Sequence, residues 1–145
     1  METTSKSARE TKKFAQKWVK ETLKVHGPVV FSLEGELGTG KTTFTQGFAV
    51  GLGIKEKIQS PTFVILKIYK CKGQGARGKQ LVHVDAYRLK SEDFKVLGWK
   101  NFIKNPNNII LVEWGNKIKN ILPKNTIRII FKHGKTQKER LISIL

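Results

Sequence analysis

The sequence is poor in cysteine, in acidic residues and in long apolar runs. One of its 145 residues is a cysteine, Cys71, which excludes an internal disulfide and a multi-cysteine metal site. No apolar run approaches the ~20 residues of a membrane span, and the N-terminus lacks the apolar core of a signal peptide. No linker-like tract, repeat or low-complexity block divides the chain. We therefore expect one cytoplasmic domain over residues 1–145 with no membrane partner, and a flexible N-terminus over residues 1–6.

The scarcity of acids leaves a formal net charge of +17, from 28 Lys and Arg against 11 Asp and Glu. Such an excess favours an anionic partner, with nucleic acid first. The alternative is a compositional habit of the source genome, spread evenly over the surface. The short runs Lys12-Lys13, Lys55-x-Lys57 and Lys117-x-Lys119 predict no dense basic patch. Both interpretations therefore stay open.

What the sequence does contain is a complete phosphate-binding loop. Gly35–Thr42 has the form G-x-x-x-x-G-K-T, between the apolar run Val29–Leu33 and a segment with helical spacing over residues 42–50. This is the strand, loop and helix order that the motif requires. Inward-turned amides and the helix N-terminus surround phosphate oxygens, while Lys41 reaches the β- and γ-phosphates and Thr42 can ligate Mg²⁺. We therefore expect the chain to bind a nucleoside triphosphate.

Helical and strand-like segments alternate along the chain. Helices are expected over residues 7–24, 41–52 and 115–122 and from Ser91 onward with a break at Gly98, and strands over residues 29–33, 63–69, 81–85, 109–112, 126–131 and 140–145. The runs at 29–33 and 109–112 are typical of strands buried on both faces. The short link between 63–69 and 81–85 predicts a hairpin. The expected fold class is α/β: a single P-loop NTPase-like domain with a mixed parallel and antiparallel sheet flanked by helices.

Two acidic residues stand at strand ends, where ligands gather in α/β sheets. Asp85 ends the strand over 81–84, and Glu113 ends the apolar run over 109–112. A P-loop protein holds Mg²⁺ through its Thr or Ser and such an acid, so Thr42, Asp85 and Glu113 are the candidate metal ligands. Glu113 could instead polarise the attacking water. A helix cap or a surface ion pair is the structural alternative for each acid.

Three further features flank these acids. The segment Ser60–Phe63 combines two hydroxyls with a rigid turn, and in a P-loop protein such a loop can sense the γ-phosphate. Strand alternation places His83, Asp85 and Tyr87 on one face, although a lone histidine is more typical of packing than of catalysis. Trp114 follows the second acid, where it either packs in the core or contacts the nucleotide.

Taken in order, these landmarks resemble the bacterial TsaE (YjeE-like) family of tRNA threonylcarbamoyladenosine biosynthesis ATPases. They are Gly35–Thr43, Ser60-Pro61-Thr62-Phe63, His83-Val84-Asp85-Ala86-Tyr87-Arg88-Leu89, Leu97-Gly98 and Val112-Glu113-Trp114. The P-loop is shared by many families, but the combination is specific to this one. The resemblance covers about residues 8 to 145.

The resemblance implies roles for individual residues and for partners. The positions implied to bind ATP or ADP are Thr11, Gly38, Thr39, Gly40, Lys41, Thr42, Thr43 and Trp114, with Thr11 near the base. Thr42, Asp85 and Glu113 would surround Mg²⁺, and Glu113, Lys41 and Asp85 would be catalytic. The family implies a weak ATPase that acts with two TsaD- and TsaB-like partner proteins, and with tRNA through that complex, in modifying the adenosine next to the anticodon.

Two other function classes stay open. One is a small nucleoside or nucleotide kinase, and the other is a basic nucleic-acid-binding module with a structural nucleotide. Such kinases usually carry a lid with several arginines, whereas only Arg77 and Arg88 lie centrally in this chain. We expect no arginine-finger candidate near the P-loop or after Glu113. Turnover by the isolated chain is therefore expected to be slow, with a partner supplying the missing cation.

Overall fold

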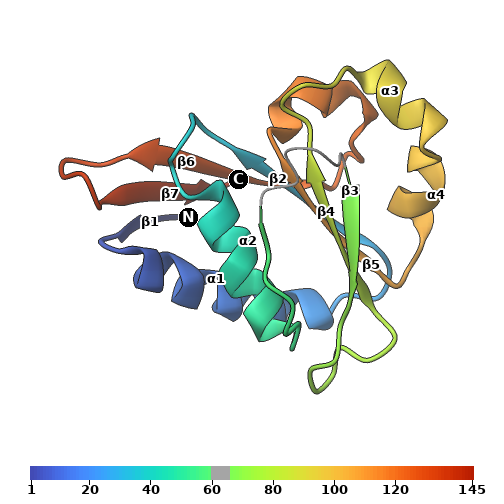
Figure 1. The fold of residues 1–145 in the computed structure, drawn as a ribbon, viewed down its shortest axis with the longest axis horizontal. Coiled ribbons are helices and arrows are strands. Elements are labelled where there is room, and N and C mark those ends of the chain that lie inside the picture. The colour runs from blue at the N-terminus through green and yellow to red at the C-terminus, as the bar shows by residue number, and fades with distance from the viewer. Residues whose placement is uncertain (60–65) are drawn as a thin grey trace.

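A seven-stranded mixed sheet organises the part of the chain that the computed structural model describes, residues 1–59 and 66–145 (Figure 1). Its elements, in chain order, are β1 (Glu2–Ser5), α1 (Ala8–Leu23), β2 (Val29–Glu34), α2 (Lys41–Gly51), β3 (Leu66–Lys70), β4 (Gln80–Asp85), α3 (Ser91–Val96), α4 (Trp99–Lys104), β5 (Asn108–Glu113), the 3₁₀ helix η1 (Gly115–Ile121), β6 (Ile127–His133) and β7 (Arg140–Ile144). The expected α/β class with a mixed sheet is confirmed.

The strands follow the order β1-β7-β6-β2-β5-β4-β3. The four inner strands β6, β2, β5 and β4 are parallel, whereas β3, β7 and β1 join them in antiparallel pairs. Every residue of β2 and β5 is buried, as their continuous apolar runs predict. The expected hairpin between β3 and β4 is present, and residues 60–65 before it lie outside the described part. Parallel pairing brings the carboxyl ends of β2, β4 and β5 to one edge of the sheet.

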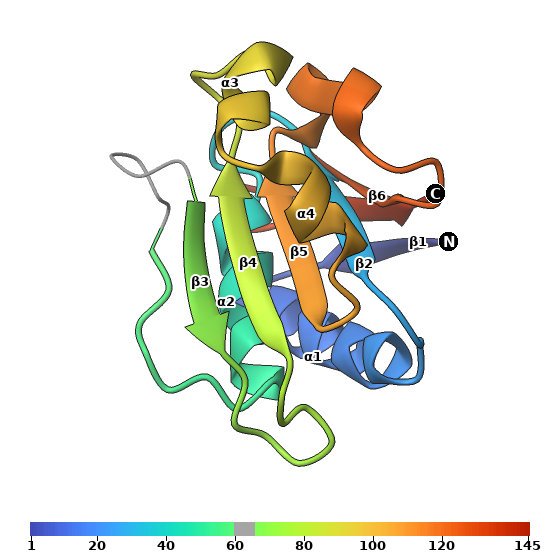
Figure 2. The same cartoon turned by 90° about the vertical axis from the view of Figure 1, so that its right-hand side faces the viewer.

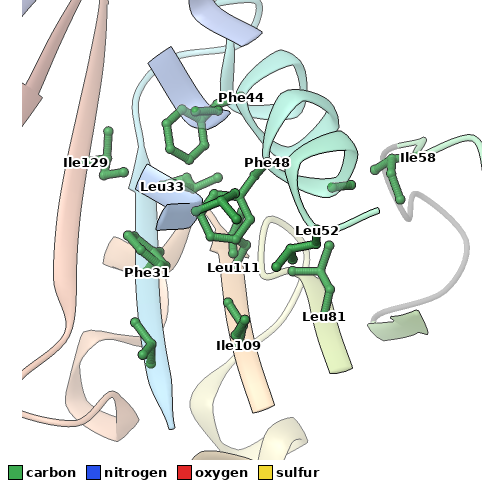
Figure 3. Packing of buried hydrophobic residues seen from close by; sticks show 14 of the residues in the cluster. Phe31, Leu33, Phe44, Phe48, Leu52, Ile58, Leu81, Ile109, Leu111 and Ile129 are labelled. Atoms are coloured by element: carbon green, nitrogen blue, oxygen red, sulfur yellow. The ribbon is translucent and has the colours of Figure 1, made fainter. Parts of the chain in front are cut away.

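Helices cover both faces of the sheet, with α1 and α2 behind β4 and β5 and α4 in front of them in Figure 2. On the first face, Phe48 of α2 packs against Phe31 of β2 with ring centroids 5.4 Å apart, and Phe44 of the same helix stacks on Phe48 (Figure 3). On the other face, α3 and α4 are separated at Gly98, whose φ of 73° confirms the expected break. No helix of the described residues is apolar and long enough to span a bilayer.

The helices α1 and α2 cross at a very short distance. A Cβ atom on Gly47 would lie 2.5 Å from the Cα atom of Lys12, closer than side chains tolerate. A residue without a side chain is therefore needed where the two helices meet. This contact fixes the start of α1 beside the loop that precedes α2.

The expectation of a flexible N-terminus over residues 1–6 is wrong. Residues 2–5 form β1, which pairs antiparallel with β7 along the edge of the sheet. The Ser5 hydroxyl is buried and lies 2.7 Å from the Thr11 hydroxyl of α1. The pairing satisfies backbone groups that β7 would otherwise leave open at the sheet edge. The four residues of this strand are all polar, so no apolar alternation in the sequence reveals it.

Candidate nucleotide-binding site

A cleft of about 1110 Å³ opens at the carboxyl edge of the sheet. Its walls come from the P-loop, the ends of β4 and β5, the start of α1 and the turn between β6 and β7. The predicted site residues that line it are Thr11, Gly38, Gly40, Lys41, Thr42, Thr43, Asp85, Glu113 and Trp114. Thr39 lies beneath the cleft surface, and Ser60–Phe63 is outside the described residues. The structure therefore brings the predicted residues together around one cavity, with Thr39 supporting it from below.

The P-loop is shaped so that its backbone faces the cleft. Gly40 has a φ of 109°, a left-handed conformation that glycine adopts without strain. The Thr39 hydroxyl donates to the Glu36 carbonyl at 2.6 Å, which closes the loop on itself. The first amides of α2 have no acceptor within the helix, because none precedes them in the helical ladder. Free amides at a helix N-terminus, together with the helix dipole, are the features that attract anionic oxygens in phosphate-binding loops.

The Lys41 ammonium lies inside the loop and is almost fully buried. It donates to the carbonyl oxygens of Gly35 at 2.6 Å and Glu36 at 2.8 Å, and it lies 4.1 Å from the centroid of the Trp114 ring. Burial lowers the pKa of Lys41, and the carboxylates of Glu113 and Asp85 oppose that shift. The ammonium therefore lies where the oxygens of a bound phosphate group would take the place of these two carbonyl oxygens as its hydrogen-bond acceptors.

Glu113 joins the P-loop to the neighbouring strand end. Its Oε1 accepts a hydrogen bond from the Thr42 hydroxyl at 2.9 Å, and its Oε2 lies 2.5 Å from Nε2 of His83. Only 3% of the Glu113 surface is exposed, so these two contacts compensate for burial of the carboxyl group. His83 is fully buried, and within the described residues its Nδ1 has no hydrogen-bond partner. His83 therefore packs in the core, as its residue type suggests, and also orients Glu113.

Asp85 provides a second carboxylate at the same edge. It lies in register with Glu113 on the parallel strands β4 and β5, and its Oδ1 accepts from the backbone amide of Tyr87 at 2.9 Å. The Thr42 hydroxyl and the two carboxylates form the hard oxygen donor set that Mg²⁺ prefers. In the described part of the chain, no group of three His, Cys, Asp or Glu residues could hold a metal alone. The residues present fit Mg²⁺ bound together with nucleotide phosphates, its usual mode.

Trp114 has the one positive φ, 62°, among the described non-glycine residues. A left-handed conformation costs a non-glycine residue about 1–3 kcal/mol. Its amide donates to the Leu33 carbonyl at 2.8 Å, which ties this turn to the strand before the P-loop. Its ring lies 4.8 Å from that of Tyr87, and the ammonium of Lys117 is 4.2 Å from the Tyr87 ring. The half-buried indole therefore forms a wall of the cleft as well as packing beside the core.

An ion pair supports the strand that enters the P-loop. The Glu34 carboxylate accepts from Arg128 of β6 at 2.8 and 2.9 Å and from the Ser32 hydroxyl at 2.9 Å. Burial alone would raise the pKa of Glu34, but the hydrogen bonds from Arg128 and Ser32 outweigh it and the pKa is lowered. The charged pair therefore fastens the end of β2 to its neighbour β6.

Arg140 lies beside the P-loop, a contact that no motif in the sequence indicates. Its guanidinium donates to the Gly38 carbonyl through Nε at 3.2 Å and Nη2 at 3.0 Å. Nη1 donates to the carbonyls of Gln137 at 2.6 Å and Glu139 at 2.9 Å. Arg9 and Arg88 also line the cleft. Sequence reasoning missed Arg140 because no local motif marks it, and only the packing of β7 beside β6 brings it to the loop.

Comparisons with known proteins agree over most of the chain. The family model described as "Threonylcarbamoyl adenosine biosynthesis protein TsaE" matches residues 5–142. The tRNA threonylcarbamoyladenosine biosynthesis protein TsaE of Treponema pallidum is 38% identical over 131 residues, 89% of each chain. The protein of the same name from Rickettsia typhi is 37% identical over 143 residues, 97% of this chain and 92% of that one.

A Bacillus subtilis TsaE is 42% identical over 105 residues, which are 72% of this chain and 62% of that protein. The crystal structure of Bacillus subtilis YdiB superposes with a TM-score of 0.72 at 31% identity, over 99% of this chain and 83% of that one. The family match and these identities agree with the order of motifs and with the geometry of the cleft. The chain belongs to the TsaE family of tRNA threonylcarbamoyladenosine biosynthesis proteins.

Proposed function

We propose that the chain is a Mg-ATP-binding P-loop ATPase, slow when alone, that acts with two partner proteins in threonylcarbamoylation of the adenosine next to the tRNA anticodon. The observation that carries this proposal is the 2.9 Å hydrogen bond from Thr42 to the buried carboxylate of Glu113. It joins a phosphate-binding loop to an acidic strand end, the pairing that P-loop nucleotide hydrolysis requires. The cleft, at about 1110 Å³, lies just above the usual range of small-molecule sites, about 300–1,000 Å³, and is large enough for a nucleotide.

The residues of the cleft divide into phosphate, metal and base contacts. The amides of residues 38–43 and the Lys41 ammonium would hold the phosphates of ATP or ADP. Thr42, Glu113 and Asp85 would hold Mg²⁺, which when bound polarises phosphoryl oxygens and neutralises developing charge. The buried Thr11 lines the cleft on the α1 side, next to Gly40, and would contact the base or ribose.

In this proposal Glu113 would act on the attacking water. One carboxylate oxygen is engaged by Thr42 and the other by His83, so the group cannot rotate freely. A fixed carboxylate at the phosphate end of the loop can orient a water and accept its proton. His83 is the positioning residue in this arrangement, because it contacts Glu113 and does not line the cleft. Trp114 and Tyr87 cover one side of the cleft and reduce access of bulk water.

Slow turnover by the isolated chain follows from how Arg140 is engaged. Within the described residues its guanidinium donates to the backbone carbonyls of Gly38, Gln137 and Glu139, so it supports the loop and is not directed at a γ-phosphate. Arg9 and Arg88 are exposed to solvent at the cleft walls. An inserted arginine is worth about 10³–10⁵ in rate to a P-loop enzyme. We infer that a partner supplies the transition-state cation and that basal turnover lies far below the ~10 s⁻¹ median of enzymes.

The kinase alternative is less well supported by the described residues. The segment after β4, Ser91–Lys104, forms two helices of six residues each and carries lysines but no arginine. A phosphoryl-transferring lid would need arginines there to clamp the moving group. Hydrolysis is therefore the reaction that these residues favour.

Phosphate release from ATP tests the proposal, measured with the isolated chain and then with the two partners and tRNA. We expect slow release alone, a faster rate in the complete mixture, and threonylcarbamoyladenosine in the tRNA. Lys41→Ala is the matched control, because it removes the phosphate cation without altering the acidic strand ends. Equal rates with and without the partners, or equal rates for the native chain and Lys41→Ala, would overturn the proposal.

Nucleotide binding is measured separately through Trp114. Replacing Trp18 and Trp99 by Phe leaves Trp114 as the one indole, and Mg-ATP should change its emission because Lys41 leaves the ring for phosphate. An unchanged spectrum in a protein that binds ATP by calorimetry would remove Trp114 from the nucleotide site.

A further inference from the structure

The exposed face of α1 carries a stripe of five cations: Arg9, Lys13, Lys17, Lys20 and Lys24, all solvent-exposed. Their spacing of three or four residues places them within an arc of about 80°, along about 22 Å of the helix and its C-cap. This basic stripe corrects the expectation that the lysines form no patch. That expectation considered neighbours in sequence, whereas a helix gathers residues one turn apart.

The stripe is held rigidly because the opposite face of α1 is part of the core. Ala15 and Val19 are buried in the core cluster, and Phe14 and Trp18 pack partly against it. The close crossing at Gly47 fixes α1 against α2. The cations therefore point to solvent in a constant order, and they do not depend on the conformation of a loop.

Acidic residues leave most of the stripe uncompensated. Glu21 pairs with Lys24 at 3.2 Å, with both side chains mostly exposed. Glu10 lies at the start of the helix, where its carboxylate accepts from the amide of Lys6 at 2.7 Å. In the described part of the chain, the other four cations of the stripe form no ion pair. A line of positive charge thus runs from the cleft, which Arg9 also lines, along the length of α1.

We propose that the basic stripe binds the phosphate backbone of RNA. That this RNA is a tRNA rests on the proposed function. The stripe itself is observed in the residues of this chain. One strand of a nucleic-acid duplex carries a phosphate about every 3.4 Å of its axis, so a 22 Å stripe faces several phosphates. Cations that contact phosphates release condensed counterions, which drives binding without base recognition.

Two other anionic partners fit the stripe less well. A membrane-surface helix inserts an apolar face into the bilayer, and the apolar face of α1 is already packed in the core. Protein interfaces are enriched in aromatic residues and arginine and depleted in lysine at their centre. The stripe has four lysines, one arginine and no aromatic side chain within its arc. Phosphate is therefore the partner chemistry that these residues favour.

The test compares two variants that each lose four lysines. The stripe variant combines Lys13→Gln, Lys17→Gln, Lys20→Gln and Lys24→Gln. The control variant combines Lys95→Gln, Lys100→Gln, Lys104→Gln and Lys124→Gln, in the layer on the other face of the sheet. Glutamine and lysine have similar helix propensities, so both variants should fold, and circular dichroism verifies this. Arg9 is left unchanged because it lines the nucleotide cleft.

Binding of an unmodified, fluorescently labelled tRNA transcript is followed by anisotropy at a series of salt concentrations. Each lost phosphate contact lowers the slope of log K against log salt by about 0.7–0.9, so the stripe variant should lose about three units of slope. At about 0.1 M salt its affinity should fall on the order of 100-fold or more, while the control variant changes by less than about threefold. Equal losses of affinity in both variants would show that binding depends on net charge alone and would overturn the proposal. The proposal would also be overturned if the stripe variant kept the native affinity, or if the native chain did not bind the tRNA.

Two further arms separate other partners from RNA. Displacement of tRNA by polyglutamate as effectively as by polyuridylate would favour an acidic protein and overturn the RNA assignment. Stripe-dependent pelleting with phosphatidylserine vesicles, without stripe-dependent tRNA binding, would overturn it in favour of a membrane. ATP turnover with the partners is measured on the same samples. If ATP turnover is absent while tRNA binding still depends on the stripe, the proposed function alone fails. If ATP turnover is present while tRNA binding does not depend on the stripe, the RNA-binding role of the stripe alone fails.

Discussion

Replacing Glu113 by glutamine separates chemistry from structure at the candidate site. The Glu113 carboxylate contacts Thr42 through one oxygen and His83 through the other. Glutamine has almost the same volume, and its remaining oxygen can still accept from Thr42. Its amide nitrogen would face Nε2 of His83, which accepts a hydrogen bond in one neutral tautomer. We therefore expect Glu113→Gln to fold and to bind nucleotide within a few-fold of the native affinity.

Turnover should respond very differently. Positioned proton transfer is worth typically 10²–10⁴ in rate, which corresponds to about 3–5 kcal/mol of barrier. The Gln variant keeps the contacts but cannot accept a proton from water. Glu113→Ala also removes the partners of His83 and Thr42, and an unsatisfied buried polar group costs about 1–3 kcal/mol of stability. The Gln variant should therefore lose rate alone, and the Ala variant should lose both rate and stability.

The assay is phosphate release at saturating Mg-ATP with the partner proteins present. Calorimetric titration with ADP and thermal unfolding of each variant serve as controls. If Glu113→Gln retains turnover within about threefold while its melting temperature is unchanged, Glu113 is a structural residue. Its contact with Thr42 would then serve the fold and not the hydrolysis of ATP.

Three more measurements test the surroundings of the cleft. Arg140→Ala should weaken nucleotide binding about 5- to 150-fold by calorimetry, because two hydrogen bonds to Gly38 are lost at about 0.5–1.5 kcal/mol each, and native affinity would contradict this. Burial raises the pKa of Cys71 to about 11, so thiol reagents at pH 8 should label it only upon unfolding, and rapid labelling of native protein would show that it is accessible. The pKa of Glu34 is lowered from 4.5 when folded, so its pair with Arg128 stabilises the protein above that pH and less as pH falls through the folded value. Arg128→Ala should therefore lower the free energy of unfolding by about 1 kcal/mol at pH 7, and this free energy should then decrease less with falling pH than in the native protein. The same dependence on acid pH in both proteins would contradict this.

The parts of the fold that the sequence predicts are those specified by local patterns. The P-loop depends on residues within one short segment, and β2 and β5 are continuous apolar runs. The meeting of Glu113 with Thr42 follows from a further rule, that parallel strands end at the same edge of a sheet. The P-loop and the two buried strands need no knowledge of which strands are neighbours, whereas the contact of Glu113 with Thr42 also depends on the pairing of β5 with β2.

The parts that were missed depend on distant pairings. The strand β1 has no amphipathic signal and forms because the edge of β7 is available. Arg140 lies 102 positions from Gly38 in sequence, and nothing nearby in the chain marks the contact. The basic stripe of α1 is a different case, since applying the helical period to charges as well as to apolar residues would have revealed it.

Departures from local preference are concentrated at the carboxyl edge of the sheet. Trp114 adopts a backbone conformation that suits glycine, Glu113 is a buried carboxyl group, and Lys41 is a buried ammonium whose pKa is lowered by burial. Each of these features opposes folding by itself, and the apolar layers on both faces of the sheet compensate for them. Residues chosen for stability alone would not adopt such conformations at neighbouring positions. Their coincidence with the cleft is the pattern expected where ligand binding, not packing, determines the choice of residue.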